Sequence, residues 1–556
     1  MAKAYQPFII ADQKTGLDTA KDPFLLPQDA WTELQDCYLY EGRIEKRQGQ
    51  ALLAGLDNRV WDVDSQQLVT SGGVAVVDPL VNTSLPIMGL FQYQNNLGGL
   101  QLIALTTQRL FSFIASLGAF IDMTGENLWS GTGANFFQGS AWLNMLFLAN
   151  GKDQLAYYDG EHVWPVTIDP NQSGQNTVVG MTLVFPYYDR IVIFNTVETL
   201  ITVTPGAIPG TTTSNGVTTV IQTVNGVTTT SVTQRIPQMA RWSDIDNQES
   251  WSAQNYLRAP TSDEIIGACM IGQQLTVFFN NSVWAFAYTG NYVQPFEWLQ
   301  IPGQGGAIAA GAVQPYQQTA MALGPERISA TDGMGAWWAD ANIPQIMQGM
   351  NQTLLPLCDS EIHDQKSQVW FSFPSAAAAT YPDSLLIYNY DTGAWSTGTF
   401  SQNCLGSWSQ VLSGGSLIAG YPQMLAGTRN GQVLTLNTGG TDFGGAAITA
   451  VMMTGQINPF SKSNRRCWLG WVDLLVNTSL TGTITVSFYE NGLLTPYLTL
   501  TGVPLVDSKA GTKSWVRLPV NVVADFHQIQ ITHATADQFV LHAMTIYAKP
   551  VGRENG

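Results

Sequence analysis

Three tracts of the sequence run through β-forming residues and close on the same kind of turn. They lie at 158–164, 331–337 and 390–395, and in each of them an Asp and a Gly come shortly before a Trp. A strand pair of this kind cannot bury its aromatic face alone, so several copies must stack against one another. The repeat therefore predicts a radial, all-β architecture, a β-propeller.

Short apolar segments separated by Gly, Asn and Asp continue from about residue 86 to about residue 450, which is typical of such a repeat. Candidate blade strands lie at 102–105, 109–114, 142–148, 190–195, 275–280, 282–288, 368–373 and 385–390, and a further hairpin is expected at 425–434. Their spacing predicts roughly five to seven blades.

The chain of 556 residues is too long for one core. A prior of roughly 100–200 residues per domain predicts about two to four domains. We expect an N-terminal arm at 1–60, a propeller-like domain at 61–450 with an insertion at 205–234, and a C-terminal β-sandwich at 451–556. The sandwich is indicated by longer segments at 468–476, 483–489, 515–520, 526–532 and 540–547.

The N-terminal arm carries the one helix that the sequence predicts. Trp31, Leu34 and Tyr38 recur at helical spacing, which indicates a short amphipathic helix. The arm is too short to bury that face by itself. We therefore expect these side chains to pack on a neighbouring subunit or on another ring-shaped component of an assembly.

Three basic residues, Arg43, Lys46 and Arg47, follow in the next predicted strand. We interpret them as a solvated edge that discourages stray strand pairing. A phosphate contact is the alternative, and it is disfavoured because a single basic triplet in an acidic chain is weak evidence for nucleic-acid binding.

The insertion at 205–234 is rich in Thr and poor in large apolar residues, and it contains the run NGVTT twice. Asn215-Gly216 and Asn225-Gly226 are strong hairpin signals between β-branched residues. The sequence therefore predicts a projecting hairpin or meander. It is either a floppy surface insertion or a β arm that pairs with a neighbouring subunit or another partner.

Charge limits the possible partners. The formal net charge is −17, and only 12% of the residues are charged. This balance argues against a surface that grips phosphates through counterion release. It leaves open a conduit for DNA, which acidic and neutral groups would line better than basic ones because attraction to phosphates would slow passage.

The five cysteines are widely spaced and form no Cys-x-x-Cys pair, so we expect free, buried thiols. The first residues lack the apolar core of a signal peptide, and no tract reaches the roughly 18 apolar residues of a membrane span. We therefore expect synthesis in a cytoplasm and no stable membrane association.

Motifs that carry chemistry are almost absent. The sequence has no P-loop, nucleophile elbow, His-Glu-x-x-His or dinucleotide fingerprint. Asp359, Glu361 and His363 would share one face of a strand, but a polar loop explains them better than a metal site does. His527, His533 and His542 are expected to be packed or rim residues. We therefore expect no catalytic, cofactor or metal site and no enzyme activity.

The Asp-x-Gly-x-Trp turns resemble the Asp-box of sialidases, in which Asp and Trp pin a hairpin between blade strands. The Ser and Thr of that box are missing here. Because the box is structural even in those enzymes, the similarity supports blades and not glycoside cleavage.

A more specific resemblance covers most of the chain. The segments 22–27 and 42–49 look like the opening of tail nozzle proteins of short-tailed bacteriophages (podoviruses), also called tail tubular protein B. The segments 241–251 and 386–396 resemble blade-closing segments of that family. The segments 470–476 and 488–489 are similar to its terminal β domain.

This resemblance implies a structural virion protein, made in the host cytoplasm, that forms a homohexameric ring in the phage tail. The ring would lie below the portal and the adaptor, or head-to-tail connector, and would carry the tail tip or needle and the fibres. Double-stranded DNA would pass through its channel during ejection without sequence-specific binding. The alternative is a receptor- or glycan-binding tail spike or lectin-like propeller, in which exposed Trp residues would stack on sugars.

Overall fold

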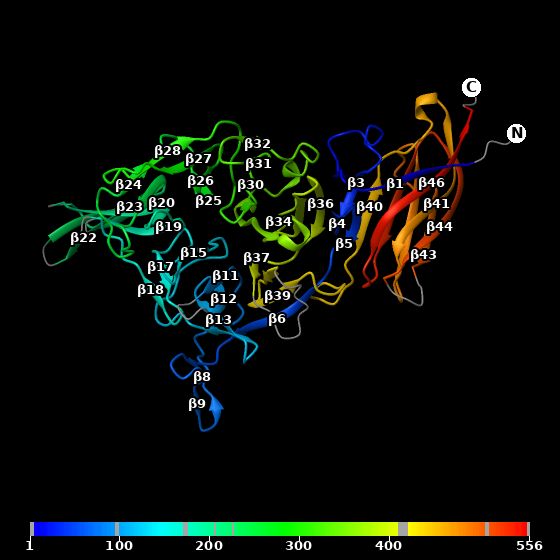
Figure 1. Cartoon of the computed structure of the whole chain (residues 1–556). Helices are drawn as coiled ribbons and strands as arrows, with labels where there is room; N and C mark the ends of the chain where they lie inside the picture. The colour runs from blue at the N-terminus through cyan, green and yellow to red at the C-terminus, as the bar shows by residue number, and fades with distance from the viewer. Residues whose placement is uncertain are drawn as a thin grey trace.

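The computed structural model describes residues 5–94, 99–170, 176–204, 207–224, 227–409, 421–505 and 511–552. In this part of the chain the fold is all-β. Its only helical turns there are the short 3-10 segments η1 (Met347–Gly349), η2 (Leu355–Leu357), η3 (Asp364–Lys366) and η4 (Ser461–Ser463). A ring of small sheets lies beside a sandwich that holds both the N-terminal and the C-terminal strands (Figure 1).

The ring is a β-propeller, with seven four-stranded blades among the described residues. Neighbouring strands within each blade pair antiparallel. The first strands of adjacent blades contact one another around the ring, and the first strand of blade 7 meets that of blade 1. This closed order confirms the predicted propeller and gives its blade number.

Blades 1 to 3 take up the first half of the ring. Blade 1 comprises β11 (Ile87–Gln94), β12 (Leu100–Thr106), β13 (Leu110–Ile114) and β14 (Ala119–Asp122). Blade 2 comprises β15 (Gln138–Trp142), β16 (Met145–Ala149), β17 (Ala156–Tyr158) and β18 (Val163–Pro165). Blade 3 comprises β19 (Asn176–Pro186), β20 (Ile191–Val203), β23 (Val227–Trp242) and β24 (Tyr256–Arg258).

Blades 4 to 7 complete the ring. Blade 4 comprises β25 (Ile265–Ile271), β26 (Gln274–Phe279), β27 (Val283–Tyr288) and β28 (Phe296–Gln300). Blade 5 comprises β29 (Val313–Tyr316), β30 (Thr319–Leu323), β31 (Ile328–Thr331) and β32 (Ala336–Trp338). Blade 6 comprises β33 (Asp359–His363), β34 (Gln368–Phe373), β35 (Ser384–Asn389) and β36 (Ala394–Thr399). Blade 7 comprises β37 (Cys404–Trp408), β38 (Gln423–Gly427), β39 (Gln432–Leu436) and β6 (Gln50–Asp57).

Blade 7 draws its last strand from the other end of the chain. β6 pairs antiparallel with β39 and also parallel with β14 of blade 1. The chain thus enters the propeller through blade 7, travels around the ring and returns to the same blade. Residues 50–57 therefore belong to the propeller, which corrects the predicted boundary at residue 60.

The three Asp-Gly-Trp turns occupy one equivalent position. Each joins the third strand to the fourth, in blades 2, 5 and 6. Asp159, Asp332 and Asn389 each accept hydrogen bonds from the N–H groups two and three residues later, at 2.8–3.1 Å. The Trp164 indole also donates to Asp159 at 2.7 Å. The repeat is therefore structural, as an Asx turn predicts.

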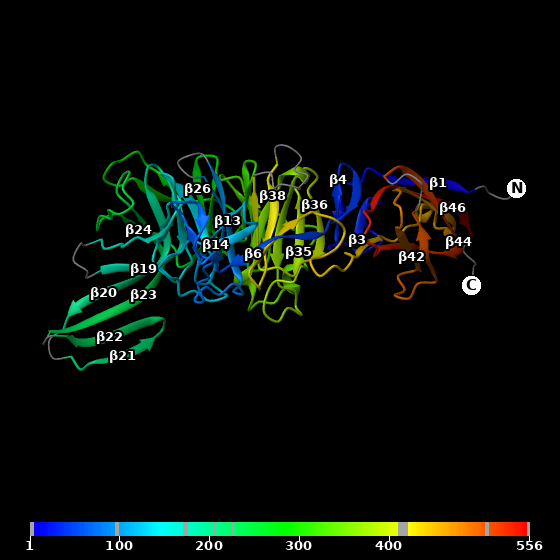
Figure 2. The ribbon, with the colours of Figure 1, turned by 90° about the horizontal axis from the view of Figure 1, so that it is seen from below.

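The second body is the β-sandwich expected at the C-terminus (Figure 2). One layer contains β1 (Gln6–Ala11), β4 (Cys37–Tyr40), β5 (Arg43–Lys46), β46 (Val540–Val551), β41 (Arg466–Asn477) and β44 (Lys513–Ala524). The other contains β3 (Ala30–Gln35), β40 (Ala450–Thr454), β45 (His527–His533), β42 (Thr483–Glu490) and β43 (Leu498–Pro504). β2 (Gly16–Leu17) pairs with both β3 and β36, and so joins the sandwich to blade 6.

The predicted N-terminal helix is wrong. Trp31 and Leu34 lie in β3 and Tyr38 lies in β4. A register shift between Trp31 and Glu33 puts Trp31 and Leu34 on the same side, and Asp36 has a φ of 52° where the chain turns into β4. A β-bulge followed by a left-handed residue thus reproduces the three-to-four spacing of a helix.

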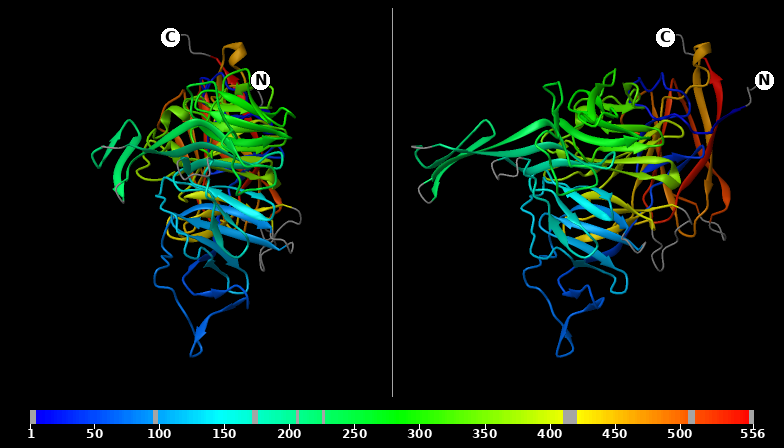
Figure 3. Two further views of the ribbon diagram at one scale, coloured as in Figure 1. Left: turned by 90° about the vertical axis from the view of Figure 1, so that its left-hand side faces the viewer. Right: turned by 60° about the vertical axis from the view of Figure 1, so that its left-hand side comes forward.

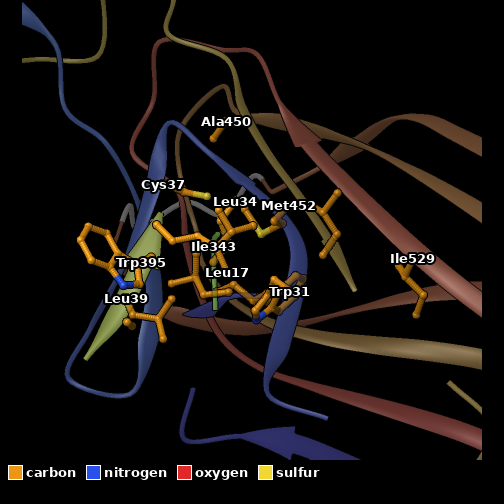
Figure 4. Packing of buried hydrophobic residues seen from close by; sticks show 14 of the residues in the cluster. Leu17, Trp31, Leu34, Cys37, Leu39, Ile343, Trp395, Ala450, Met452 and Ile529 are labelled. Atoms are coloured by element: carbon orange, nitrogen blue, oxygen red, sulfur yellow. The ribbon is translucent and has the colours of Figure 1, made fainter. Parts of the chain in front are cut away.

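The predicted inter-subunit role of Trp31, Leu34 and Tyr38 is corrected as well. These side chains are 1%, 0% and 2% exposed within their own chain. Trp31 and Leu34 pack near Met452 of the sandwich, in a core that also includes Trp395 of blade 6 (Figure 4). The N-terminal segment therefore belongs to a core shared by the propeller and the sandwich. The C-terminal strands bury its apolar side chains, so no neighbouring subunit is needed to do so.

The basic triplet does not form a solvated edge. Lys46 and Arg47 are each only 3% exposed, whereas Arg43 is partly exposed and pairs with Glu45 at 2.8 Å. Lys46 lies 3.2 Å from Nδ1 of His533 and donates to a backbone carbonyl, and burial lowers its pKa to about 8. The prediction failed because Lys46 is buried against His533 and Thr535, and Arg47 is bonded to Thr399, all of them hundreds of positions away in the sequence.

Residues 58–81 form a small excursion below blade 1, visible at the bottom of Figure 1. It contains β7 (Trp61–Asp62), β8 (Gln67–Leu68), β9 (Thr70–Ser71) and β10 (Val74–Ala75).

The five cysteines are all free and buried, which confirms the prediction of free, buried thiols.

Candidate functional site

Two adjacent cavities, together called the tunnel below, lie at the centre of the propeller among the first strands of the blades and the loops before them. One part, of about 140 Å³, lies against blades 1, 2, 5, 6 and 7. Another, of about 470 Å³, reaches blades 3 and 4. Spaces of this size can hold water or a small ligand but not a nucleic-acid duplex.

Two carboxyl groups of β33 face this tunnel. Asp359 Oδ2 accepts the Leu405 N–H at 2.7 Å, and Glu361 accepts the Ile362 N–H at 3.1 Å. Burial raises the pKa of both, from 3.8 for Asp359 and from 4.5 for Glu361 to about 7. They can therefore gain or lose protons near neutral pH, and they are the most perturbed acids of the tunnel.

His363 does not join them. Its ring lies edge-on to Trp370, 5.9 Å between centroids, in a separate pocket beside Tyr38, and burial lowers its pKa to about 4. Among the described residues, no three His, Cys, Asp or Glu side chains gather in a way that could hold a metal ion. The predicted common face of Asp359, Glu361 and His363 is kept, since the register of β33 with β34 is unbroken, but His363 lies at the end of the strand in the separate pocket.

The remaining candidate histidines are packing residues, as predicted. His527 and His533 are 2% and 0% exposed. His527 Nδ1 lies 2.8 Å from the Tyr497 hydroxyl, and His542 Nε2 lies 2.8 Å from Asn477 Oδ1. Each ring is engaged by the protein's own polar groups.

The most conspicuous surface feature is an arm that leaves blade 3 and stands clear of the ring (Figure 2, Figure 3). It consists of the distal parts of β20 and β23 together with β22 (Val217–Val224) and β21 (Gly210–Ser214). Asn215 and Gly216 have φ values of 51° and 73°, as the hairpin turn requires. The predicted projecting hairpin is therefore present at this turn, whereas Asn225 and Gly226 lie outside the described residues.

The base of the arm is rigid. A β-bulge at Asn195, with a φ of 57°, marks the point where β20 leaves the blade. Just beyond it, Glu198 accepts two hydrogen bonds from Arg241, at 2.7 and 2.8 Å, and both side chains are buried. A bidentate pair of this kind holds the departing strands in one orientation.

Hydroxyl pairs hold the arm together in place of an apolar core. Thr side chains on adjacent strands lie 2.5–3.2 Å apart, oxygen to oxygen. Such cross-strand pairs stabilise a sheet without a second layer. The pairs are Thr199 with Thr233, Thr204 with Thr230, Thr213 with Thr218, and Thr223 with Thr228.

The outer edge of the arm is unprotected. Within the described residues β21 pairs with β22 alone, and all five of its residues are exposed. It has neither a charged residue nor Pro, and its register with β22 is unbroken. Natural edge strands usually carry one of these features to prevent pairing with other chains. β21 is therefore open to strand addition.

The arm also lacks charge. No Asp, Glu, Lys or Arg occurs between Glu198 and Arg235, although the whole chain has a net charge of −17. Exposed apolar residues lie along it instead, including Val203 at 59% and Val224 at 61%. The uncharged run is visible in the sequence and adds a second signal to the Asn-Gly turns from which a β arm is one of the two predictions.

Comparison with known proteins adds little. No family model matches the sequence, and no curated protein matches it. Among solved structures, the designed protein Ika8 has a TM-score of 0.31 at 8% identity, covering 77% of this chain and 99% of that one. Similarities of this size carry no argument about function.

Two further structures are enzymes of carbohydrate hydrolysis. A glycoside hydrolase family 43 arabinoxylan arabinofuranohydrolase from Bacillus subtilis has a TM-score of 0.24 at 11% identity, covering 97% of this chain and 99% of that one. An exo-β-1,3-galactanase from Phanerochaete chrysosporium has a TM-score of 0.21 at 10% identity, covering 76% of this chain and 97% of that one.

Within the described residues, no helix has the length and hydropathy needed to cross a membrane.

Proposed function

We propose that this chain is a non-enzymatic structural subunit of the tail nozzle of a short-tailed bacteriophage. Copies of the chain would assemble into a homohexameric ring below the adaptor and would carry the tail tip and fibres. The observation that carries the proposal is the uncharged β arm with its unprotected edge, because a strand edge of this kind is stabilised by pairing with another chain.

Charge favours a second copy of this chain as the partner. Two chains that each carry a net charge of −17 repel one another over most of their surfaces. The segment between Glu198 and Arg235 escapes this repulsion because it carries no charge. Self-assembly through the arm is therefore less costly electrostatically than assembly through the acidic faces.

The size of the propeller tunnel supports a particular route for DNA in this proposal. Openings of about 140 and 470 Å³ are too small for a duplex. DNA would have to pass between subunits, through the centre of a ring of propellers. The low density of basic residues suits such a channel, because few phosphate contacts would form during passage.

The test removes the outer hairpin of the arm and leaves its base in place. Residues 205–227 are replaced by a two-residue Asn-Gly turn that joins Thr204 to Thr228, so that β20 and β23 still pair. Mass photometry should show an oligomer for the full chain and a monomer for the variant, with equal thermal midpoints. A variant that forms the same oligomer would refute the role of the arm.

A further inference from the structure

A cleft of about 600 Å³ lies across blades 3, 4 and 5, far from the outer edge of the arm in sequence. Its walls come from the β19–β20 and β25–β26 turns, from β27 and β28, and from the β31–β32 turn. The volume falls within the range of roughly 300–1,000 Å³ that is usual for small-molecule sites.

Two stacked tyrosines form one wall of the cleft. The rings of Tyr188 and Tyr288 lie 4.0 Å apart at an interplanar angle of 17°. Their side chains remain 45% and 43% exposed, so ring surface is still available to a ligand. Tyr187 packs edge-on against Tyr188 at 4.8 Å and supports it from the core side.

The backbone that presents Tyr188 is unusual. Tyr188 and Asp189 have φ values of 47° and 57°, and they form a two-residue turn closed by a hydrogen bond from Tyr187 to Arg190. Gly and Asn normally occupy such turns, because a bulky residue with positive φ is strained. Strain that the surrounding structure maintains is characteristic of functional positions. Here its effect is to hold an exposed aromatic ring over the cleft.

Besides the tyrosine hydroxyls, the polar side chains of the cleft include glutamine amides. Gln274 donates to the Gly333 carbonyl at 3.2 Å and links the turns of blades 4 and 5. Gln273 and Gln300 are exposed and form no side-chain hydrogen bond with the described part of the chain. Each amide offers both donors and an acceptor to a ligand.

The cleft is uncharged. None of the described residues that line it is Asp, Glu, Lys, Arg or His. An anionic or cationic ligand would therefore find no counter-charge there. A ligand suited to this lining has apolar faces that stack on rings and hydroxyl groups that exchange hydrogen bonds with amides.

We propose that this cleft binds a neutral oligosaccharide, whose sugar rings stack on Tyr188 and Tyr288 and whose hydroxyls bond to Gln273 and Gln300. The proposal is independent of ring assembly, since none of the lining residues belongs to the arm. It assigns binding and no cleavage.

The experiment uses saturation-transfer difference NMR on the full chain with cellotetraose, maltotetraose and β-1,4-galactotetraose as neutral probes. An oligogalacturonate and a tetra-alanine peptide serve as a charged and a peptide probe. We expect at least one neutral tetrasaccharide to receive saturation, with the charged and peptide probes silent. Binding of the charged or peptide probe alone, or of no probe, would overturn the proposal.

Variants then assign any signal to the cleft. Tyr188→Gly removes the ring and relieves the positive φ, and Gln300→Ala changes an exposed side chain, so both should fold. Each should raise the Kd by about tenfold, the effect expected from losing one good contact. Tyr292→Ala is the matched control, because Tyr292 is an 81% exposed tyrosine of blade 4 that lies outside the lining. Equal affinity in all variants would place the sugar elsewhere and contradict the proposal.

Discussion

Arg47 and Asp36 form a buried ion pair, with Arg47 Nε 2.8 Å from Asp36 Oδ1 and both side chains no more than 3% exposed. Asp36 also accepts hydrogen bonds from the backbone and the hydroxyl of Thr399, at 3.0 and 2.9 Å. Thr399 ends β36 of blade 6, whereas Asp36 and Arg47 flank the sandwich strands β4 and β5. The pair therefore fastens the sandwich to the propeller.

Asp36→Ala should destabilise the protein severely. It leaves the Arg47 guanidinium buried without its partner, a change that costs roughly 3–5 kcal/mol in comparable sites. Urea unfolding followed by tryptophan fluorescence measures the effect. Lys14→Ala removes the partner of Asp12 in an exposed pair and should leave the midpoint unchanged. Similar midpoints for the two variants would contradict the claim that the buried Arg47–Asp36 pair stabilises the protein.

If β6 closes the propeller, substitutions at two positions on that strand should differ strongly in their cost to stability. Ala54 is 3% exposed and packs in the core of blades 1 and 7, whereas Leu52 is 52% exposed. Ala54→Asp should cost more than about 3 kcal/mol, because it buries an unpaired carboxylate. Leu52→Asp should be nearly neutral. Thermal unfolding by circular dichroism compares them, and equal losses would argue against β6 as a blade strand.

The tunnel carboxyls predict a pH-dependent stability. The pKa of Asp359 and that of Glu361 are raised from 3.8 and 4.5 to about 7, so the unfolded chain releases these protons first as the pH rises. Their contribution is full below about pH 4 and is lost as the pH approaches 7. The double variant Asp359→Asn, Glu361→Gln should therefore gain stability relative to the native chain across this window.

Buried histidines change the stability with pH in the opposite direction, so the native chain has to be compared with the double variant at each pH. Burial lowers the pKa of His363 from 6.5 to about 4, so its contribution is present above 6.5 and is lost as the pH falls toward 4. The difference between native chain and double variant cancels this histidine effect. Urea midpoints measured at several pH values give that difference, and a constant difference would contradict the carboxyl assignment.

The thiols should be unreactive in the native state. All five cysteines are buried, and burial raises the pKa of Cys269 and that of Cys467 to about 12. Since the thiolate is the reactive form, Ellman's reagent should modify none of them quickly in buffer and all of them in denaturant. Rapid native labelling of any one would show that its surroundings open readily.

Local signals in the sequence predicted much of the fold. The Asp-Gly-Trp turns identified the third and fourth strands of three blades because an Asx turn needs only its own few residues. The Asn215-Gly216 turn was correctly predicted for the same reason. The run of longer strand segments after residue 450 correctly predicted the C-terminal sandwich.

Features that depend on distant pairing could not be predicted. β6 and β39 meet across nearly the whole propeller sequence, and no local pattern marks them as partners. The false helix at Trp31 arose because a bulge imitates helical spacing, and Arg47 looked exposed because Asp36 and Thr399 bury it only in the fold. The cleft at Tyr188 depends on three blades coming together, which single-strand patterns do not encode.

The most direct test of the central claim, assembly through the edge of β21, is negative-stain electron microscopy of the full chain and of Thr212→Lys. A lysine on an open edge strand opposes pairing with another strand without disturbing the blade. Thr501→Lys on β43, another exposed edge strand, is the matched control. The account predicts closed rings with an open centre for the full chain and the control, and single particles for Thr212→Lys. Rings that persist in Thr212→Lys, or a full chain that stays monomeric at every concentration, would contradict it.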